Sequence, residues 1–171
     1  MKQDIEKATV CVVGLGYVGL PLVETFARSL SVIGYDIDTK RVNQLKQQNR
    51  KKGLLFTDDP KMIAKADFAI ICVPTPLTKF KDPELSYVQS AARTIGQNMK
   101  KGSVVILEST VYPGVTEEII VPILEKESGF TCGKDFEVAY SPERINPGDT
   151  EHDVDKVTKI VAARNEKTTD L

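Results

Sequence analysis

Short apolar runs recur along the chain, and segments with helical spacing separate them. Runs such as residues 8–13 and 67–73 are apolar at nearly every position, which is typical of strands that are buried on both faces of a sheet. We therefore predict strands at residues 8–13, 31–35, 67–73, 104–107, 137–140 and 157–162.

Polar segments with a helical pattern fill most of the intervals between these runs. Asp38 is placed to cap one helix, because its carboxylate can accept the free N–H groups of the first turn. Pro60 suits the first turn of another helix. The stretch 49–60 is interpreted as a surface loop, basic first and acidic afterwards. The predicted helices are residues 18–30, 39–48, 60–65, 85–99 and 116–126.

Alternation of buried strands with amphipathic helices predicts an α/β fold, in which a parallel sheet is covered on both faces. Six strands fit the doubly wound order 3-2-1-4-5-6. The chain has 171 residues and 41% hydrophobic content. A chain of this length buries about two thirds of its unfolded surface, so we expect one domain over residues 1–171.

Charge and cysteine content narrow the class of protein. The 23 lysines and arginines nearly balance 24 acids, which argues against nucleic acid or an anionic membrane as the main partner. No apolar run approaches the roughly 20 residues of a membrane span, and the charged start MKQDIEK lacks the apolar core of a signal peptide. Three cysteines without CxxC spacing do not form a disulfide framework. We expect a soluble, reduced, cytoplasmic protein.

Three glycines within six positions follow the first predicted strand, in the order GLGYVG. This is the GxGxxG pattern, in which Gly14 permits a tight turn, Gly16 the close approach of a pyrophosphate, and Gly19 close packing of helix on strand. A helix that begins near Tyr17 offers free N–H groups and the positive end of its dipole to an anion. The alternative is an ordinary strand-to-helix connection that needs room.

An acid at the end of the next strand supports the first interpretation. Asp36 lies 17 residues beyond Gly19 (36 minus 19), near the expected spacing of about 20. Its carboxylate can accept both hydroxyls of an adenosine ribose and repel the 2′-phosphate of NADP, although Lys40 and Arg41 nearby weaken the repulsion. The alternative for Asp36 is a strand-end acid that faces water. The pattern predicts a Rossmann-type domain that binds NAD.

Three further segments each follow a predicted strand: VPTPLT (73–78), ESTVYPG (108–114) and YSPERINPGD (140–149). Together with GLGYVGLP they resemble the UDP-glucose/GDP-mannose dehydrogenase family, over its N-terminal NAD-binding domain. The form SPERINPGD is similar to the branch that oxidises UDP-N-acetylhexosamines, such as the UDP-N-acetylglucosamine 6-dehydrogenases of polysaccharide biosynthesis. The resemblance implies oxidation of the sugar C6 alcohol to a carboxylate, in two steps that consume two NAD.

The resemblance also implies roles for individual residues. Thr110 is expected to position a catalytic water, and Glu143 to face the sugar C6 and take part in acid–base chemistry. The alternatives are that Thr110 only caps a turn and that Glu143 only pairs with Arg144. Arg144 and Asn146 are expected to contact the substrate with Glu143. The expected cofactor-binding residues are Gly14, Leu15, Gly16, Tyr17, Val18, Gly19 and Asp36, with Arg41 near the adenosine end, Val73, Pro74, Thr75 and Pro76 on the adenine-ribose side, and Ser109, Thr110 and Val111 at the nicotinamide end; no metal site is expected.

One position departs from the family pattern. UDP-glucose dehydrogenases often carry a second glutamate four positions after the first, whereas this chain has Pro147, which supports the N-acetylhexosamine branch. The family's catalytic cysteine and its lysine, asparagine and aspartate partners lie beyond the matched region. Cys11 and Cys72 lie in apolar strands and Cys132 in a distant loop, so none is expected to be a nucleophile. His152 is interpreted as a surface or loop-bracing residue.

The chain ends soon after KIVAARN, which resembles the last strand and turn of the nucleotide domain. We therefore expect a domain of a longer, homo-oligomeric enzyme, inactive when isolated from the linking helix and sugar domain. Two alternatives stay open: a stand-alone NAD-binding or sensing module without catalysis, and a UDP-glucose or GDP-mannose 6-dehydrogenase. A hydroxyacid dehydrogenase is disfavoured because YSPERINPGD has no place in that pattern.

Overall fold

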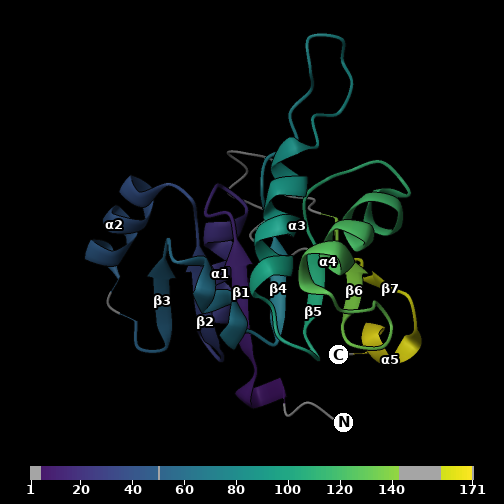
Figure 1. Ribbon diagram of the computed structural model, residues 1–171. Helices are drawn as coiled ribbons and strands as arrows, with labels where there is room; N and C mark the ends of the chain where they lie inside the picture. Colours follow the sequence, from purple (N-terminus) through teal and green to yellow (C-terminus); the bar gives the residue numbers. More distant parts are fainter. Residues whose placement is uncertain (1–4, 50, 143–158, 171) are drawn as a thin grey trace.

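A seven-stranded sheet runs through the computed structural model, which describes residues 5–49, 51–142 and 159–170 (Figure 1). The strand order is β3-β2-β1-β4-β5-β6-β7, and every neighbouring pair is parallel except β6 with β7. The strands are β1 (Thr9–Val13), β2 (Ser31–Tyr35), β3 (Leu54–Thr57), β4 (Phe68–Ile71), β5 (Val104–Leu107), β6 (Glu137–Tyr140) and β7 (Ala162–Ala163).

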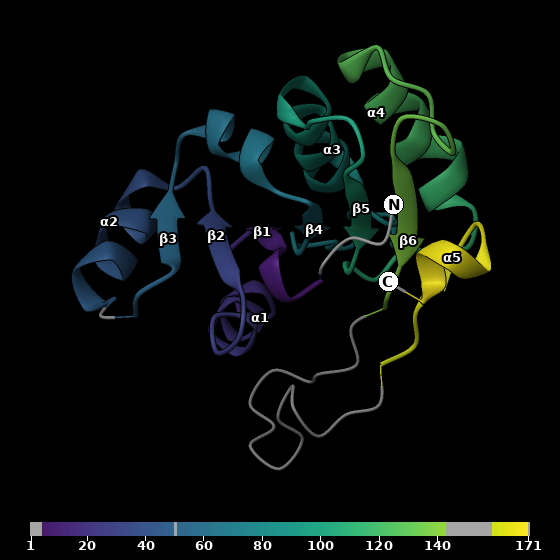
Figure 2. The same cartoon turned by 90° about the horizontal axis from the view of Figure 1, so that it is seen from below.

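Helices cover both faces of the sheet, as predicted. Alternate residues of β1 enter opposite cores: Val10 and Val12 pack with α1 and α2, whereas Cys11 and Val13 pack with η2, α3 and α4. Figure 2 shows α1 on one side of the sheet and α3 and α4 on the other. The helices are α1 (Gly19–Phe26), α2 (Thr39–Gln48), α3 (Ser86–Asn98), α4 (Val121–Ser128) and α5 (Glu166–Thr169), with 3-10 turns η1 (Ile5–Lys7) and η2 (Pro60–Lys65) and a π-helical turn η3 (Thr116–Ile120).

The interpretation of residues 49–60 as a surface loop is wrong, because Leu54–Thr57 forms β3 and pairs in parallel with β2. The strand lies between charged residues in a segment whose composition is typical of a surface loop, so its four apolar and β-branched residues do not stand out. Phe56 is buried against Gly34, where a Cβ atom would lie 2.7 Å from the Phe56 ring. The predicted order counted residues 67–73 as the third strand, beside 31–35, and that placement is wrong, because Phe68–Ile71 is β4 and pairs with β1. Once β3 is inserted, the order of the first six strands is 3-2-1-4-5-6, and β7 follows as a seventh strand.

The last predicted strand, residues 157–162, requires a second correction. Residues 157 and 158 lie outside the described residues, and the described strand β7 is Ala162–Ala163. β7 runs antiparallel to β6, so the sheet is not wholly parallel. Antiparallel edge strands are common on such sheets, and sequence pattern alone does not give strand direction.

The carboxyl ends of the parallel strands meet at one edge of the sheet. The glycine turn after β1, Asp36 after β2, Cys72 after β4 and Glu108 after β5 all lie at this edge. Ligands of doubly wound sheets bind there, beside the point where the chain changes direction between β1 and β4. The fold therefore brings the candidate residues together.

We expect Asp38→Ala to destabilise the fold through α2. Asp38 Oδ1 accepts hydrogen bonds from the backbone N–H groups of Lys40 (2.9 Å) and Arg41 (3.2 Å), as the sequence predicts. Loss of such a cap costs about 1 kcal/mol, which lowers the melting temperature of a domain of this size by about 2–4 °C. Asp38→Asn retains the acceptor and serves as the control. Equal melting temperatures of the Ala variant and the unaltered chain in calorimetry would contradict the assignment.

Candidate cofactor-binding site

Two of the three motif glycines are required by packing. Gly14 has φ of +100°, and a Cβ atom there would lie 2.6 Å from the carbonyl oxygen of Cys72. A Cβ atom on Gly19 would lie 1.9 Å from the Gly14 carbonyl oxygen. Gly16 differs, because no atom lies within 4 Å of the position its Cβ would occupy. An ordinary connection that needs room accounts for Gly14 and Gly19, whereas the open space at Gly16 suits the approach of a ligand.

Side chains from the residue after β2 and from α2 hold the turn at Leu15. Asp36 Oδ2 accepts the Leu15 N–H at 2.8 Å, while Oδ1 accepts the Asp38 N–H at 2.9 Å. Arg41 donates from Nε and Nη2 to the Leu15 carbonyl oxygen, each at 3.3 Å. Asp36 is therefore hydrogen-bonded to the glycine turn, and the alternative of a strand-end acid that only faces water is wrong. A carboxylate offers about four acceptor positions, so Asp36 retains capacity for ribose hydroxyls.

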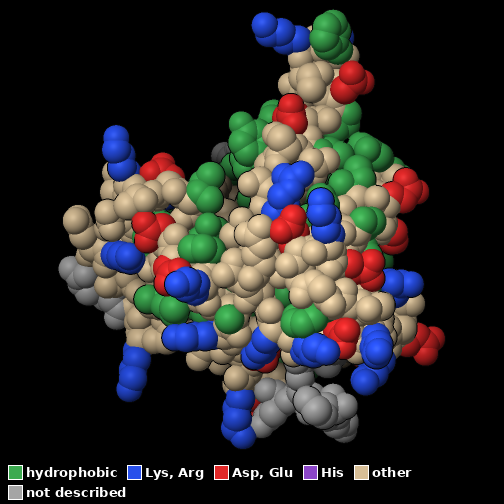
Figure 3. Space-filling model, in the orientation of Figure 1, with side chains coloured by type: hydrophobic (Ala, Val, Ile, Leu, Met, Phe, Trp, Pro, Cys, Tyr) green, Lys and Arg blue, Asp and Glu red, His purple; other side chains and the backbone are tan. Residues whose placement is uncertain are grey.

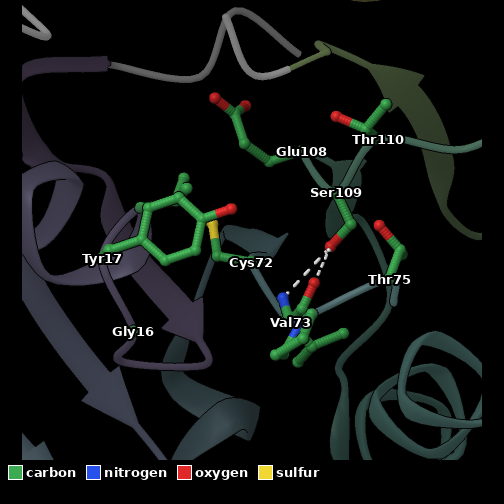
Figure 4. A pocket seen from close by; sticks show the side chains of 10 residues that line it. Gly16, Tyr17, Cys72, Val73, Thr75, Glu108, Ser109 and Thr110 are labelled. Carbon is green, nitrogen blue, oxygen red and sulfur yellow. Dashed lines mark hydrogen bonds between the residues drawn. The ribbon is translucent and has the colours of Figure 1, made fainter. Parts of the chain in front are cut away.

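Two adjacent pockets lie on either side of this turn. The first, which we call the Asp36 pocket, has a volume of about 280 Å³ and includes Tyr35, Ile37 and part of α3. The second, which we call the Glu108 pocket, has a volume of about 110 Å³ and includes Tyr17 (Figure 4). Both are lined by Gly16, Cys72, Val73 and Pro74. This pair of pockets suits a ligand with two halves joined near Gly16.

Most of the predicted residues line these pockets. Thr75 lines the Glu108 pocket rather than the side that holds Asp36, and Pro76 lines neither. The chain leaves the pockets at Pro76, where the 76–84 loop begins. A hydrogen bond from the Glu84 N–H to the Pro76 carbonyl oxygen closes the base of this loop. Val111 lines a third pocket, beside β6 and β7. The predicted residues in the Asp36 pocket are Gly14, Leu15, Gly16, Asp36, Val73 and Pro74, and those in the Glu108 pocket are Gly16, Tyr17, Val18, Val73, Pro74, Thr75, Ser109 and Thr110.

Ser109 and Thr110 differ in what their hydroxyl groups do. Ser109 is buried, and its Oγ accepts the Val73 N–H (3.1 Å) and donates to the Val73 carbonyl (2.7 Å), as the dashed lines in Figure 4 show. Ser109 therefore shapes the pocket by tying the end of β5 to the end of β4. Thr110 is exposed, and Figure 4 shows its hydroxyl oxygen turned toward the side on which Glu108 lies. Its predicted role with water stays a prediction.

Glu108 is the functional candidate that the sequence analysis missed. Its side chain is 4% exposed, and its Oε1 forms an ion pair with Nζ of Lys159, 51 residues away. Burial lowers the pKa of Lys159. A signal was present in the sequence, since Glu108 directly follows the apolar strand Val104–Leu107 at the ligand-binding edge. Ion pairing over such a separation has no local pattern.

The cysteines behave largely as expected. Cys11 is fully buried, and burial raises the pKa of its thiol to about 12, so it is unreactive. Cys132 lies before β6, at the opposite edge of the sheet, where its Sγ accepts from Arg164 Nη1 at 3.4 Å. Cys72 is buried as predicted, but it also lines both pockets.

Several predicted residues lie outside the described residues, namely Glu143, Arg144, Asn146, Pro147 and His152. Within the described ranges, no cluster of His, Cys, Asp and Glu suits a metal ion. The helices in those ranges are too short or too polar to cross a membrane.

A doubly wound sheet with an open glycine turn and an acid after the second strand defines a dinucleotide-binding domain. The family model for the UDP-glucose/GDP-mannose dehydrogenase family, NAD binding domain, matches residues 8–171. The chain belongs to this family, and NAD is the cofactor of the domain. The predicted resemblance is confirmed.

The relatives found by comparison with individual proteins include several that are named as UDP-N-acetylhexosamine dehydrogenases. It is 46% identical to "Protein CapL" of Staphylococcus aureus, over 91% of this chain and 39% of the relative. It is 40% identical to a UDP-N-acetyl-D-glucosamine 6-dehydrogenase of Salmonella typhi, over 98% of this chain and 42% of the relative. The solved structure of a UDP-D-ManNAc dehydrogenase from Pyrococcus horikoshii superimposes with a TM-score of 0.82 at 34% identity, covering 93% of this chain and 42% of that one. The chain thus spans about two fifths of these relatives.

The glycine turn generates a paired prediction. Gly16→Val places a branched side chain where the pyrophosphate is expected, so NAD affinity should fall at least tenfold while the melting temperature is retained. Gly19→Ala introduces the contact with the Gly14 carbonyl, and overpacking of this kind costs about 1–3 kcal/mol of stability. Titration calorimetry and thermal denaturation measure the two effects. If the Gly16 variant retained its NAD affinity, the glycine motif would be an ordinary strand-to-helix connection and not a cofactor contact.

Asp36 generates a second prediction, on cofactor choice. The unaltered chain should bind NAD more tightly than NADP, because the carboxylate repels the 2′-phosphate. Asp36→Asn keeps an oxygen that can accept the Leu15 N–H but removes the charge, so the ratio of NAD to NADP affinity should fall about tenfold. Asp36→Ala should weaken NAD binding further, since it also releases the turn. Titration of each variant with both cofactors tests this, and equal affinities in the unaltered chain would overturn it.

Proposed function

We propose that this chain is the cofactor domain of an NAD-dependent nucleotide-sugar dehydrogenase. The enzyme oxidises the C6 alcohol of a UDP-N-acetylhexosamine, with UDP-N-acetylglucosamine favoured, to the uronate with two NAD in polysaccharide biosynthesis. The observation that carries the proposal is identity of 40% and 42% to two UDP-N-acetyl-D-glucosamine 6-dehydrogenases over nearly the whole chain. A UDP-N-acetyl-D-mannosamine dehydrogenase at 37% identity makes the mannosamine epimer the second candidate.

The pocket geometry supports an extended NAD site along the edge of the sheet. In this arrangement Asp36 accepts hydrogen bonds from the adenosine ribose, the open backbone at Gly16 faces the pyrophosphate, and the Glu108 pocket receives the nicotinamide half. NAD, when bound, supplies the hydride acceptor. The hydroxyl of Thr110 at this pocket can donate and accept hydrogen bonds, so it can orient a water molecule beside the reacting carbon.

The remaining parts of the proposal rest on the family resemblance. Glu143 faces the sugar C6 as an acid–base residue, and Arg144 and Asn146 contact the substrate. The reactive cysteine and most sugar contacts belong to a longer, homo-oligomeric, cytoplasmic protein that contains this domain. The relatives' lengths support that view, because this chain spans about two fifths of each.

The 171-residue chain should bind NAD but produce no NADH. Hydride transfer needs the sugar C6 held about 3–3.5 Å from the nicotinamide, and one wall of the pocket does not immobilise a nucleotide sugar. We expect no absorbance change at 340 nm with UDP-N-acetylglucosamine, UDP-N-acetylmannosamine or UDP-glucose.

The full-length protein should oxidise one of the three sugars, with UDP-N-acetylglucosamine favoured, and lose activity on Glu143→Gln. Thr110→Val tests the proposed water contact and should lower kcat more than it raises KM. Full-length protein that binds NAD but oxidises none of these sugars would favour a sensing module instead. Robust NADH formation by the chain alone would show that the catalytic groups lie elsewhere.

A further inference from the structure

The buried carboxylate of Glu108 lies in a ligand pocket, and stability of the fold does not account for its charge. Glu108 lines the pocket with its side chain 4% exposed, whereas its partner Lys159 is 25% exposed. Burying an ion pair is costly, and well-packed apolar residues often replace such a pair without loss of stability. Leu107 and Ser109, its neighbours, already join β5 to the core and to β4. The negative charge of Glu108 is therefore not required for packing at the end of β5.

Strand order decides which half of NAD this carboxylate meets. Asp36 follows β2, on one side of the switch between β1 and β4, and Glu108 follows β5 on the other. With the adenosine ribose at Asp36 and the pyrophosphate at Gly16, the nicotinamide half enters the Glu108 pocket. This placement rests on the function proposed above.

The two redox states of the cofactor differ in charge at this point. The oxidised nicotinamide ring carries a positive charge, and the reduced ring is neutral. A carboxylate in a pocket with little water stabilises a nearby cation. Among the described lining residues Glu108 supplies the formal charge, because none of the others is an aspartate, glutamate, lysine, arginine or histidine. Lys159 opposes this field less strongly, since its side chain is more exposed than that of Glu108 and water screens it better.

We propose that Glu108 makes the site prefer oxidised over reduced cofactor, and that Lys159 is the positioning residue that keeps this carboxylate ionised. Such a preference favours release of the reduced product and binding of the second NAD, as two successive oxidations require. Without its partner, a buried carboxylate takes up a proton and loses its charge. Neither Glu108 without Lys159 nor Lys159 without Glu108 should then give the preference for oxidised cofactor.

The test is the ratio of the dissociation constants for NADH and NAD, measured by titration calorimetry on the 171-residue chain. Glu108→Gln should lower this ratio about threefold to tenfold, mainly by weakening NAD binding. Lys159→Met should lower it at neutral pH, and Lys159→Arg should retain it. Glu24→Gln is the control, because it removes one negative charge from the exposed surface of α1.

The double variant Glu108→Gln/Lys159→Met leaves no unpaired charge, so it should fold and give the ratio of Glu108→Gln alone. Thermal denaturation of each variant separates loss of structure from loss of preference. An unaltered chain that binds neither cofactor would overturn this inference together with the proposed function. Binding with the same ratio in Glu108→Gln and in the unaltered chain would overturn the inference alone.

Discussion

The site depends on a close backbone approach between the β1–α1 turn and the end of β4. Gly14 faces the Cys72 carbonyl and Gly19 faces the Gly14 carbonyl, at separations that leave no space for a Cβ atom. This contact lets α1 start directly above the switch between β1 and β4. It also exposes Gly16 at the surface, between the Asp36 pocket and the Glu108 pocket. A side chain at either packed position would move the turn and alter both pockets.

The charged side chains of Asp36 and Arg41 hold the backbone of the turn. Asp36 and Arg41 bind opposite ends of the Leu15 residue, through its N–H and its carbonyl oxygen. The guanidinium of Arg41 is thus engaged with the protein backbone. Backbone N–H groups and the amino end of α1, which has no acid in its first turn, remain to receive a pyrophosphate. Because these groups belong to the turn, they hold their geometry before the ligand arrives.

Much of this arrangement could be predicted from the sequence, for identifiable reasons. The strands β2, β5 and β6 are largely apolar segments, and their predicted bounds agree with the structure. The cap at Asp38 is a local interaction and was also predicted. β3 was missed because charged residues and a glycine surround it closely and give the whole segment the composition of a surface loop, and the antiparallel direction of β7 has no sequence signal. The pairing of Glu108 with Lys159 depends on the fold that brings them together.

Residues of the sequence motifs at the ligand-binding edge differ in whether their polar atoms are free to contact a ligand. Motifs identify which segments reach the ligand-binding edge, but hydrogen bonding decides which atoms remain available there. Ser109 belongs to a motif, yet its hydroxyl is hydrogen-bonded to Val73. Glu108 has no role implied by the family resemblance, yet it places a charge in the pocket. Along the edge, an acceptor at Asp36, donors at the glycine turn and a carboxylate at Glu108 follow one another. NAD presents ribose hydroxyls, a pyrophosphate and a cationic ring in the same order, and this agreement is the electrostatic basis of the binding mode that we propose.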